Sequence, residues 1–168
     1  GQTDAAWATW YPYDRTVFPR GVPAPAWQFA TGSQQGTAYR LHISGTNIEY
    51  EGYFSGAGQQ LRPAQGAWDA MGTASDGTDL TVEISKLVGG VKYGPITSTV
   101  RLAHGSLKGT IYYNTYDSAL AGGTGAVMRI RGNSTTPEVL VGGCTVCHSV
   151  AADGSTITDA VAAGLSKT

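Results

Sequence analysis

The sequence predicts an all-β protein whose main part is an antiparallel β-sandwich, and three observations support this prediction. Apolar and polar residues alternate with a period of two through most of residues 27–141, the pattern of strands with one buried and one solvated face. Clusters of Gly, Ser, Thr, Asn and Asp separate these runs. The spacing accommodates roughly seven or eight short strands, as in many antiparallel sandwiches.

The expected strands follow one another along residues 27–141. The clearest alternation places Leu80, Val82 and Ile84 on one face, between polar neighbours. A short last strand is expected over residues 137–141. The other expected strands each present an apolar face of the same kind, made by Tyr39, Leu41 and Ile43, by Ile48, Tyr50 and Phe54, by Ile96, Val100 and Leu102, by Ile111 and Tyr113, and by Ala126, Met128 and Ile130.

Residues 1–26 have a different character and are expected to form an extended arm. The run YPYDRTVFP at residues 11–19 is rich in aromatic residues and prolines, and Pro23 and Pro25 follow it. Prolines at this density exclude a helix and a central strand. An extended entry followed by a strand that carries a tryptophan, here Trp27, is typical of immunoglobulin-like and fibronectin-like sandwiches, and the sandwich is expected to be of this kind.

Residues 142–168 form a third segment that contains both cysteines. Near its end, Thr158 and Asp159 favour the start of a short helix over residues 160–165. Such a helix is too short to be stable alone. The predicted organisation is therefore an arm over 1–26, a β-sandwich over 27–141, and a cysteine-bearing segment over 142–168.

Composition limits the classes of function. A chain of 168 residues suits one ordinary globular domain. Its net charge of −1 and charged fraction of 14% argue against nucleic-acid binding, which needs a basic surface. No apolar run approaches the ~20 residues that cross a bilayer, so no transmembrane segment is predicted. Low charge with 24 glycines is common in secreted β-proteins, which predicts a secreted, extracellular or cell-surface location, with the periplasm as the alternative.

One short motif carries recognisable chemistry. Cys144 and Cys147 are the only two cysteines of the chain, and His148 follows directly. This CxxCH spacing is the attachment pattern of c-type haem, because two thiols three positions apart can form thioethers with both vinyl groups of one porphyrin. The next histidine can then reach the iron from the same side. We therefore predict one covalent haem c, with His148 as the proximal iron ligand and electron transfer as the function.

Three other interpretations of the motif compete with haem attachment. A thioredoxin-like redox pair would need a helix N-terminus in a βαβ context, which the strand pattern does not favour. A zinc site could combine both thiolates, His148 and one further histidine. A local disulfide between Cys144 and Cys147 is the third.

Most electron-transfer haems have a second axial ligand, usually Met or His. Met128 lies on the apolar face of its expected strand, and Met71 suits a loop or the core, so both are expected to fill space rather than bind iron. His42, on the polar face of its strand, and His104, before a turn, would otherwise be ordinary surface histidines. With a haem present, we expect His42 to be the distal iron ligand, with His104 as the alternative.

A haem also needs apolar cover and partners for its propionates. Arg129 and Arg131 are candidates for the propionates, although a solvated strand edge explains each of them as well. Ordinary packing likewise explains each aromatic candidate for the lining. These candidates are Trp7, Trp10, Tyr11, Tyr13, Phe18, Tyr112, Tyr113 and Tyr116.

Six segments share a recognisable pattern: residues 11–21 (YPYDRTVFPRG), 50–54 (YEGYF), 80–87 (LTVEISKL), 94–97 (GPIT), 105–114 (GSLKGTIYYN) and 143–149 (GCTVCHS). They resemble a family of large secreted or lipid-anchored proteins of myxobacteria and related environmental bacteria. The resemblance covers about residues 11–156 and implies a sandwich-like N-terminal module that ends in a haem-binding motif and often continues into a β-propeller. It also favours His42 as the distal ligand. Arg15 stands where the family pattern has a glycine.

The leading hypothesis is therefore an extracytoplasmic monohaem cytochrome. One haem cannot carry electrons far, so redox partner proteins or copies of the same chain, as a homo-oligomer or a filament, are expected. The alternative is a surface adhesion or carbohydrate-binding sandwich in which Trp7, Trp10 and Trp68 stack on sugars. A haem enzyme or gas sensor with an open sixth position is the third hypothesis. No catalytic triad or phosphate loop is recognisable, and no enzymatic activity is predicted.

Overall fold

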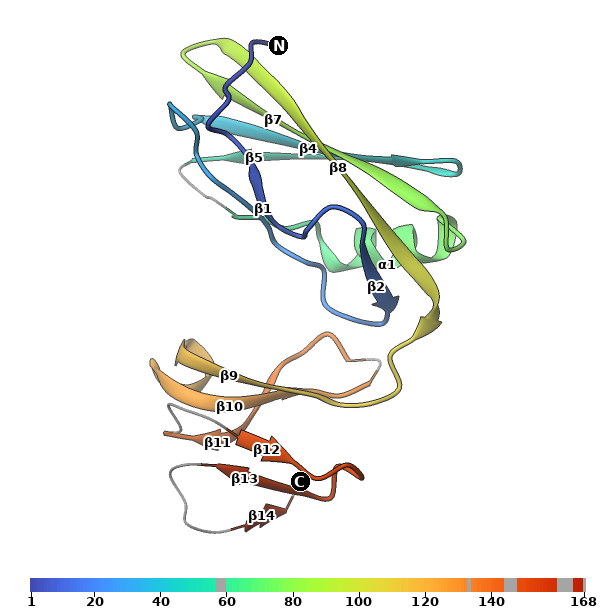
Figure 1. Cartoon of the computed structure of the whole chain (residues 1–168), viewed down its shortest axis with the longest axis vertical. Helices are drawn as coiled ribbons and strands as arrows, with labels where there is room; N and C mark the ends of the chain where they lie inside the picture. The colour runs from blue at the N-terminus through green and yellow to red at the C-terminus, as the bar shows by residue number, and fades with distance from the viewer. Residues whose placement is uncertain (57–59, 133, 144–147, 160–164, 168) are drawn as a thin grey trace. The chain divides into compact units, whose positions relative to one another are not determined.

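The computed structural model describes residues 1–56, 60–132, 134–143, 148–159 and 165–167, and it confirms the all-β prediction. The chain divides into two compact units, Gly1–Ser106 and Leu107–Thr168 (Figure 1). This boundary falls inside residues 27–141, which the alternation assigns to a single sandwich. Alternation reports the two faces of each strand and carries no information on which strands pack together.

The first unit is built on a five-stranded sheet with the strand order β2-β8-β7-β4-β5. Three of its four strand pairs are antiparallel, whereas β2 and β8 run parallel, which departs from the purely antiparallel sandwich expected. Its strands are β2 (Thr16–Arg20), β4 (Ala38–Gly45), β5 (Ile48–Ser55), β7 (Asp79–Val88) and β8 (Val91–Ser106).

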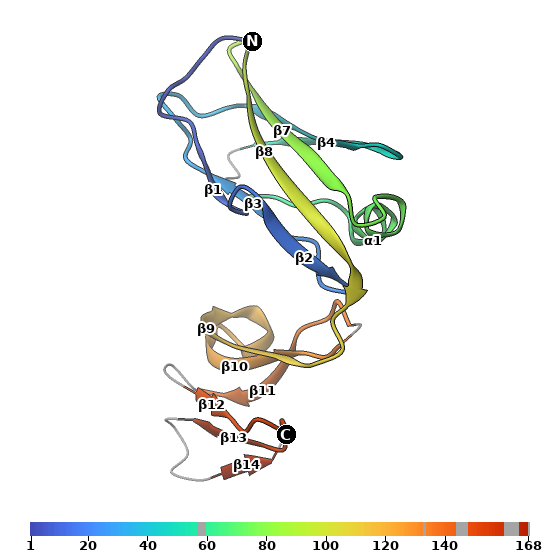
Figure 2. The same cartoon turned by 45° about the vertical axis from the view of Figure 1, so that its right-hand side comes forward.

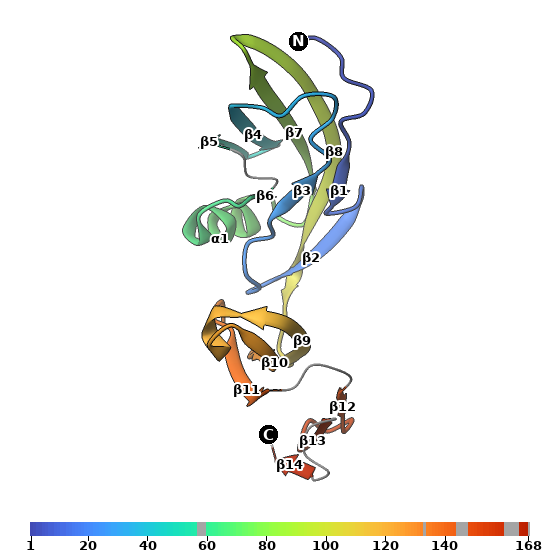
Figure 3. The same ribbon diagram turned by 90° about the vertical axis from the view of Figure 1, so that its left-hand side faces the viewer.

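A second layer combines a small sheet with the helix α1 (Gln65–Ala74), as Figures 2 and 3 show. The small sheet has the order β1-β3-β6, formed by β1 (Thr9–Tyr11), β3 (Trp27–Phe29) and β6 (Gln60–Leu61). Strand alternation did not predict α1. Its signal in the sequence is the spacing of Trp68, Met71 and Gly72, the three buried residues of the helix, which lie at positions i, i+3 and i+4.

The core of the first unit confirms the predicted apolar faces. Leu41, Ile43, Leu80 and Val82 are fully buried on neighbouring strands of the large sheet. Aromatic residues of the second layer join this core: the Trp68 ring of α1 meets the Phe18 ring of β2 at 5.4 Å and the Trp27 ring of β3 at 6.0 Å, edge to face in both cases. The remaining buried apolar side chains of this layer include Phe29 and Leu61.

The N-terminal residues are extended, as expected, but they belong to the fold. Strand β1 pairs with β3, and β2 pairs with β8. Arg15 has a φ of 65°, in the left-handed region that glycine adopts most easily. A residue with a side chain therefore holds a left-handed backbone conformation at this turn.

A buried ion pair attaches the first residues to β7. Lys86 continues the inward-facing row of β7 and is only 2% exposed. Its ammonium donates to Asp4 Oδ2 at 2.7 Å and to the carbonyl oxygens of Thr31 at 2.7 Å and Gln34 at 2.6 Å. The same nitrogen lies 5.0 Å from the centre of the Trp7 ring. All three donors of this buried charge are thus satisfied.

The second unit contains two small antiparallel sheets. The first has the order β11-β10-β9 and the second the order β12-β13-β14. Val127 and Ile157, from the two sheets, form a buried cluster against which Tyr112, Leu140, Val141 and Val150 pack. The elements are β9 (Ile111–Ser118), the 3-10 helix η1 (Ala119–Ala121), β10 (Thr124–Ile130), β11 (Glu138–Gly142), β12 (His148–Val150), β13 (Thr156–Asp159) and β14 (Leu165–Lys167).

The prediction of a short helix near the C-terminus is wrong for the residues at both of its ends. Thr158 and Asp159 belong to β13, where they pair with Ser149 and His148, and Leu165 pairs with Thr158 in β14. Residues 160–164 lie outside the described residues. Pairing with β12 decides the conformation here, because a single turn of helix has little stability of its own. No helix in the described parts of the chain is long and apolar enough to span a membrane.

Candidate functional site

The two cysteines of the CxxCH motif lie between β11 and β12. Cys144 and Cys147 fall outside the described residues, and so does the side chain of His148. His148 is the first residue of β12, and its backbone pairs with that of Asp159 in β13. On the other side, β11 ends at Gly142, and Gly143 follows with a φ of 74°. The motif thus connects two sheets of the second unit.

The strand that begins at His148 is held by a well-bonded hairpin. In the turn between β12 and β13, the Ser155 amide and hydroxyl donate to Asp153 Oδ1 at 3.0 and 2.7 Å. These bonds lower the pKa of the Asp153 carboxyl. The Ala151 amide donates to the Thr156 carbonyl at 2.9 Å, and Val150 packs on the Val127–Ile157 cluster. The backbone of the predicted proximal ligand is therefore anchored by β13.

His42 lies on the outer face of β4, between two carboxylates. Its Nδ1 is 2.9 Å from Glu83 Oε2, and its Nε2 is 3.1 Å from Glu49 Oε1. The bond to Glu83 is the main cause that raises the pKa of His42, and burial opposes it. A histidine whose Nδ1 donates to a carboxylate resembles a metal ligand oriented by its partner. For Nε2 to bind iron, Glu49 must move away, and its side chain is 74% exposed.

His104 has a more open environment near the end of β8. Its side chain is 68% exposed, and its Nδ1 lies 3.4 Å from Asp76 Oδ1. The ring also lies beside Gly77, where a Cβ would come within 2.6 Å of Nε2. His104 therefore lacks the short bond from Nδ1 to a half-buried carboxylate that orients His42. Both histidines belong to the first unit, whereas the cysteine motif belongs to the second.

The two methionines are in the core, as expected. Met71 on α1 and Met128 on β10 are each 1% exposed. Neither thioether is presented on the surface of its unit, which agrees with their predicted role as space-filling side chains.

Arg129 and Arg131, the predicted propionate partners, both form ion pairs with Glu138. Arg129 Nε lies 2.9 Å from Glu138 Oε2, and Arg131 Nε lies 3.3 Å from Glu138 Oε1. The hydrogen bond from Arg129 is the main cause of the lowered pKa of the Glu138 carboxyl. This cluster fits the interpretation of both arginines as a strand edge with its own ion pairs.

The aromatic candidates for the haem lining separate into distinct groups. Trp7 and Phe18 are buried in the core of the first unit, so they are structural residues rather than part of a haem lining. Trp68, expected at the surface by the carbohydrate alternative, is likewise buried under β2 and β3. Tyr112 packs on the Val127–Ile157 cluster, and Tyr113 is half-buried on β9. The exposed members are Trp10, Tyr11, Tyr13 and Tyr116.

Two features of the first unit were not apparent in the sequence. The Asp4–Lys86 pair joins residues far apart along the chain, and a hollow on the outer face of the large sheet gathers residues from four strands. Within the described residues, no group of three or more His, Cys, Asp or Glu side chains is arranged to hold a metal ion.

Comparison with known proteins identifies no relative. No family model matches the chain, and neither a curated protein nor a solved structure matches it.

Proposed function

We propose that the protein is a monohaem c-type cytochrome that transfers electrons outside the cytoplasm. The observation that carries the proposal is the CxxCH motif, formed by the only two cysteines of the chain and His148. The donor set fits the group chemically, because two thiols can form thioethers and an imidazole can ligate iron. When bound, the haem would supply a one-electron couple at its iron.

The residues of the chain have separate roles in this proposal. Cys144 and Cys147 would attach the porphyrin covalently, and His148, whose backbone β13 anchors, would bind the iron. His42 is the proposed distal ligand, because the Glu83 carboxylate orients its ring. The partner of its Nε2 is the exposed Glu49 carboxylate, which is free to turn away into solvent. Redox partner proteins or further copies of the chain would accept the electron.

The small core of the second unit also supports a bound apolar group. Of the 22 apolar residues buried in the described parts of the chain, only Ala126, Val127, Met128 and Ile157 belong to this unit. Units of about 60 residues bury little surface and commonly depend on a metal, a disulfide or a cofactor. A covalently attached porphyrin would add apolar surface to this unit.

The test is the visible spectrum of the full chain, expressed in a host with c-type haem attachment machinery. A Soret band that survives acid-acetone extraction, with a pyridine haemochrome typical of thioether-linked haem, is expected. The control is Cys144→Ala/Cys147→Ala, which should lose covalent haem but still fold in the first unit. Wild-type protein without haem would contradict the proposal.

The distal ligand is tested in the same preparation. His42→Ala should convert a low-spin spectrum to a high-spin one that binds carbon monoxide, and His104→Ala should leave the spectrum unchanged. The reverse result would assign the ligand to His104. An unchanged low-spin spectrum in both variants would exclude both histidines.

The carbohydrate-binding alternative depends on a different surface. With Trp7 and Trp68 buried, it is left with Trp10 and its neighbours Tyr11 and Tyr13, whose rings are 6.4 Å apart. Glycan-array binding that Trp10→Ala abolishes, in protein without haem absorbance, would favour this alternative.

A further inference from the structure

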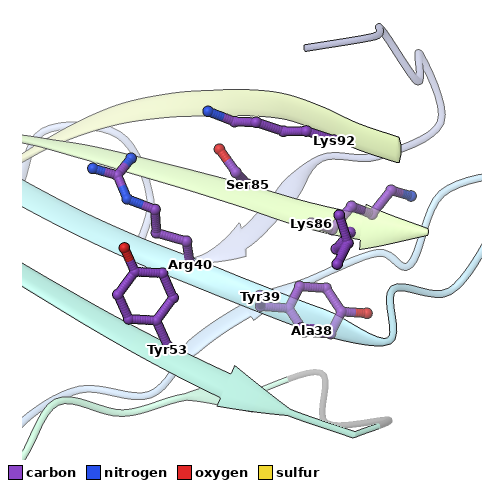
Figure 4. Close-up of a pocket in the computed structure, with 8 residues that line it drawn as sticks. Ala38, Tyr39, Arg40, Tyr53, Ser85, Lys86 and Lys92 are labelled. Carbon is purple, nitrogen blue, oxygen red and sulfur yellow. The ribbon is translucent and has the colours of Figure 1, made fainter. Parts of the chain in front are cut away.

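A hollow of about 240 Å³ lies on the outer face of the large sheet, in the first unit (Figure 4). Two cross-strand rows build it. In one row, Arg40 of β4 lies opposite Tyr53 of β5 and Ser85 of β7; in the other, Ala38 lies opposite Leu87. The methyl group of Ala38 is much shorter than its neighbours, so the surface is depressed at this point.

Ser85 supplies a buried hydroxyl without a partner. The residue is 4% exposed, and its Oγ accepts or donates no hydrogen bond among the described residues. The register of β7 against β8 shifts between Ile84 and Lys86, which places Ser85 at an irregularity of the kind common beside functional sites. Figure 4 shows its hydroxyl directed toward the space between the charged ends of Arg40 and Lys92.

The charges around the hollow leave one positive charge uncompensated. The Arg40 guanidinium pairs with the Glu51 carboxylate, which also accepts the Tyr53 hydroxyl at 2.7 Å. The neighbouring Lys86 ammonium is directed to the opposite side of the sheet, where Asp4 neutralises it. The Lys92 amine, at the rim, has no ion pair within the described part of the chain.

Apolar side chains complete the walls. Tyr53 is 73% exposed, and Leu87 of β7 is also exposed beside the hollow. The Tyr53 ring and the Leu87 side chain line the hollow from β5 and β7, on either side of β4, and offer apolar surface on which a planar ring can pack. Most small-molecule sites combine such walls with a few polar groups that orient the ligand.

We propose that this hollow binds a small aromatic carboxylate. The carboxylate lies between the Lys92 ammonium and the guanidinium donors of Arg40 that Glu51 does not use, and it accepts the hydrogen bond of Ser85 Oγ. The ring packs on Leu87 and the Tyr53 ring. The hollow is smaller than most drug-sized sites, which limits the ligand to a single ring with a short acidic chain.

The probe is 3-phenylpropionate, titrated into the ¹⁵N-labelled full chain and followed by NMR. Saturable shifts are expected at the amides of Ala38, Tyr53 and Ser85. The neutral analogue 3-phenylpropanamide should bind about tenfold more weakly, since it lacks the charge that Lys92 recognises. Equal affinity of the acid and the amide, or shifts confined to other residues, would overturn the proposal.

Three variants test the roles of the residues. Lys92→Gln should weaken binding about tenfold, whereas the matched control Lys108→Gln, an exposed lysine of the second unit, should not. Ala38→Leu fills the hollow and should abolish binding. Equal affinity of Lys92→Gln and Lys108→Gln would refute the assignment.

Ser85→Ala separates a binding role from a structural one. Because it removes an unpartnered buried hydroxyl, it should raise the melting temperature while weakening 3-phenylpropionate binding several-fold. The control is Ser44→Ala, on the outer face of β4. It should change neither the melting temperature nor the affinity for 3-phenylpropionate. A stabilised Ser85→Ala variant with unchanged affinity would show that the hydroxyl does not take part in binding.

Discussion

At the scale of single residues, the Asp4–Lys86 pair shows how a charge is accommodated in the core. Lys86 follows Leu80, Val82 and Ile84 on the inward face of β7, where an apolar residue would be expected. It is tolerated because a carboxylate and two carbonyl oxygens take its three donors. The pair also ties the first residues of the chain to the large sheet.

This pair predicts a pH dependence of folding. The hydrogen bond from the Lys86 ammonium, against burial and with further hydrogen bonds from the Ser33 hydroxyl and amide, lowers the pKa of Asp4 from 3.8 to about 2. Since the folded-state pKa is the lower one, the pair stabilises the fold above about pH 4, and this stability is lost as the pH falls from 3.8 toward 2. Urea unfolding measured between pH 2 and pH 6 should show a shallower acid limb for Asp4→Asn than for the wild type.

A partner variant provides the control for this experiment. Lys86→Met leaves the Asp4 carboxylate without its partner and should lower the free energy of unfolding by about 3 kcal/mol at neutral pH. The double change Asp4→Leu/Lys86→Met should recover much of that loss. An acid limb identical in the wild type and Asp4→Asn would show that other carboxyls control acid unfolding.

Arg15 carries backbone strain that a glycine would relieve. Its φ of 65° places a side chain in the left-handed region, and that side chain is 88% exposed with a single distant ion pair to Asp14. Arg15→Gly should therefore raise the free energy of unfolding, by up to about 1 kcal/mol, although the flexible unfolded state of glycine offsets part of the gain. Chemical denaturation measures the change, and Arg15→Val should be destabilising.

At the scale of elements, α1 illustrates why a short amphipathic helix escapes notice among strands. It has no side-chain N-cap, and two of its ten residues are glycines. Its stability comes from Trp68 and Met71, which are buried in the core. The Gln65 side chain adds a tertiary anchor, because its Oε1 accepts the Ala24 amide at 2.9 Å.

The two glycines of α1 make a matched pair for mutation. A Cβ at Gly66 would meet open space, so Gly66→Ala should stabilise the protein by about 0.5–1 kcal/mol through helix propensity alone. At Gly72 a Cβ would lie 3.3 Å from Leu102 Cδ2, so Gly72→Ala should lose that gain to crowding against β8. Equal stabilisation of both variants in urea unfolding would show that α1 or the Leu102 side chain shifts at little cost to accommodate the added methyl group.

At the scale of the whole molecule, the two units differ in how much core they possess. The first buries aromatic and aliphatic residues between two layers, whereas the described residues of the second form one small cluster around Val127 and Ile157. If the second unit carries the haem, cofactor attachment should stabilise it selectively.

Hydrogen exchange tests this dependence. If the proposed haem is attached, amides of β10 and β13 should lose protection by at least about tenfold in Cys144→Ala/Cys147→Ala, because the second unit then lacks the stabilising effect of its cofactor. Amides of β4 and β7 in the first unit serve as the internal reference and should not change. Equal protection of β10 and β13 with and without haem would mean that this small core is sufficient.

The sequence by itself determined the all-β class, the inward faces of the strands and the CxxCH motif, because alternation and short motifs are local properties. Leu41, Leu80 and Val100 are buried as their spacing predicted. The left-handed conformation at Arg15, by contrast, is a finding of the structure.

Only the tertiary structure decided which distant residues meet. The parallel pairing of β2 with β8, the burial of Trp7 and Trp68, and the Asp4–Lys86 bond all join segments whose contact no local spacing encodes. The same holds for the environment of His42, which Glu83 of β7 defines, and for the strand conformation at Thr158, which pairing with β12 imposes. Long-range pairing prevails at these places because isolated turns and short helices contribute little stability, whereas buried contacts and sheet ladders contribute most of it.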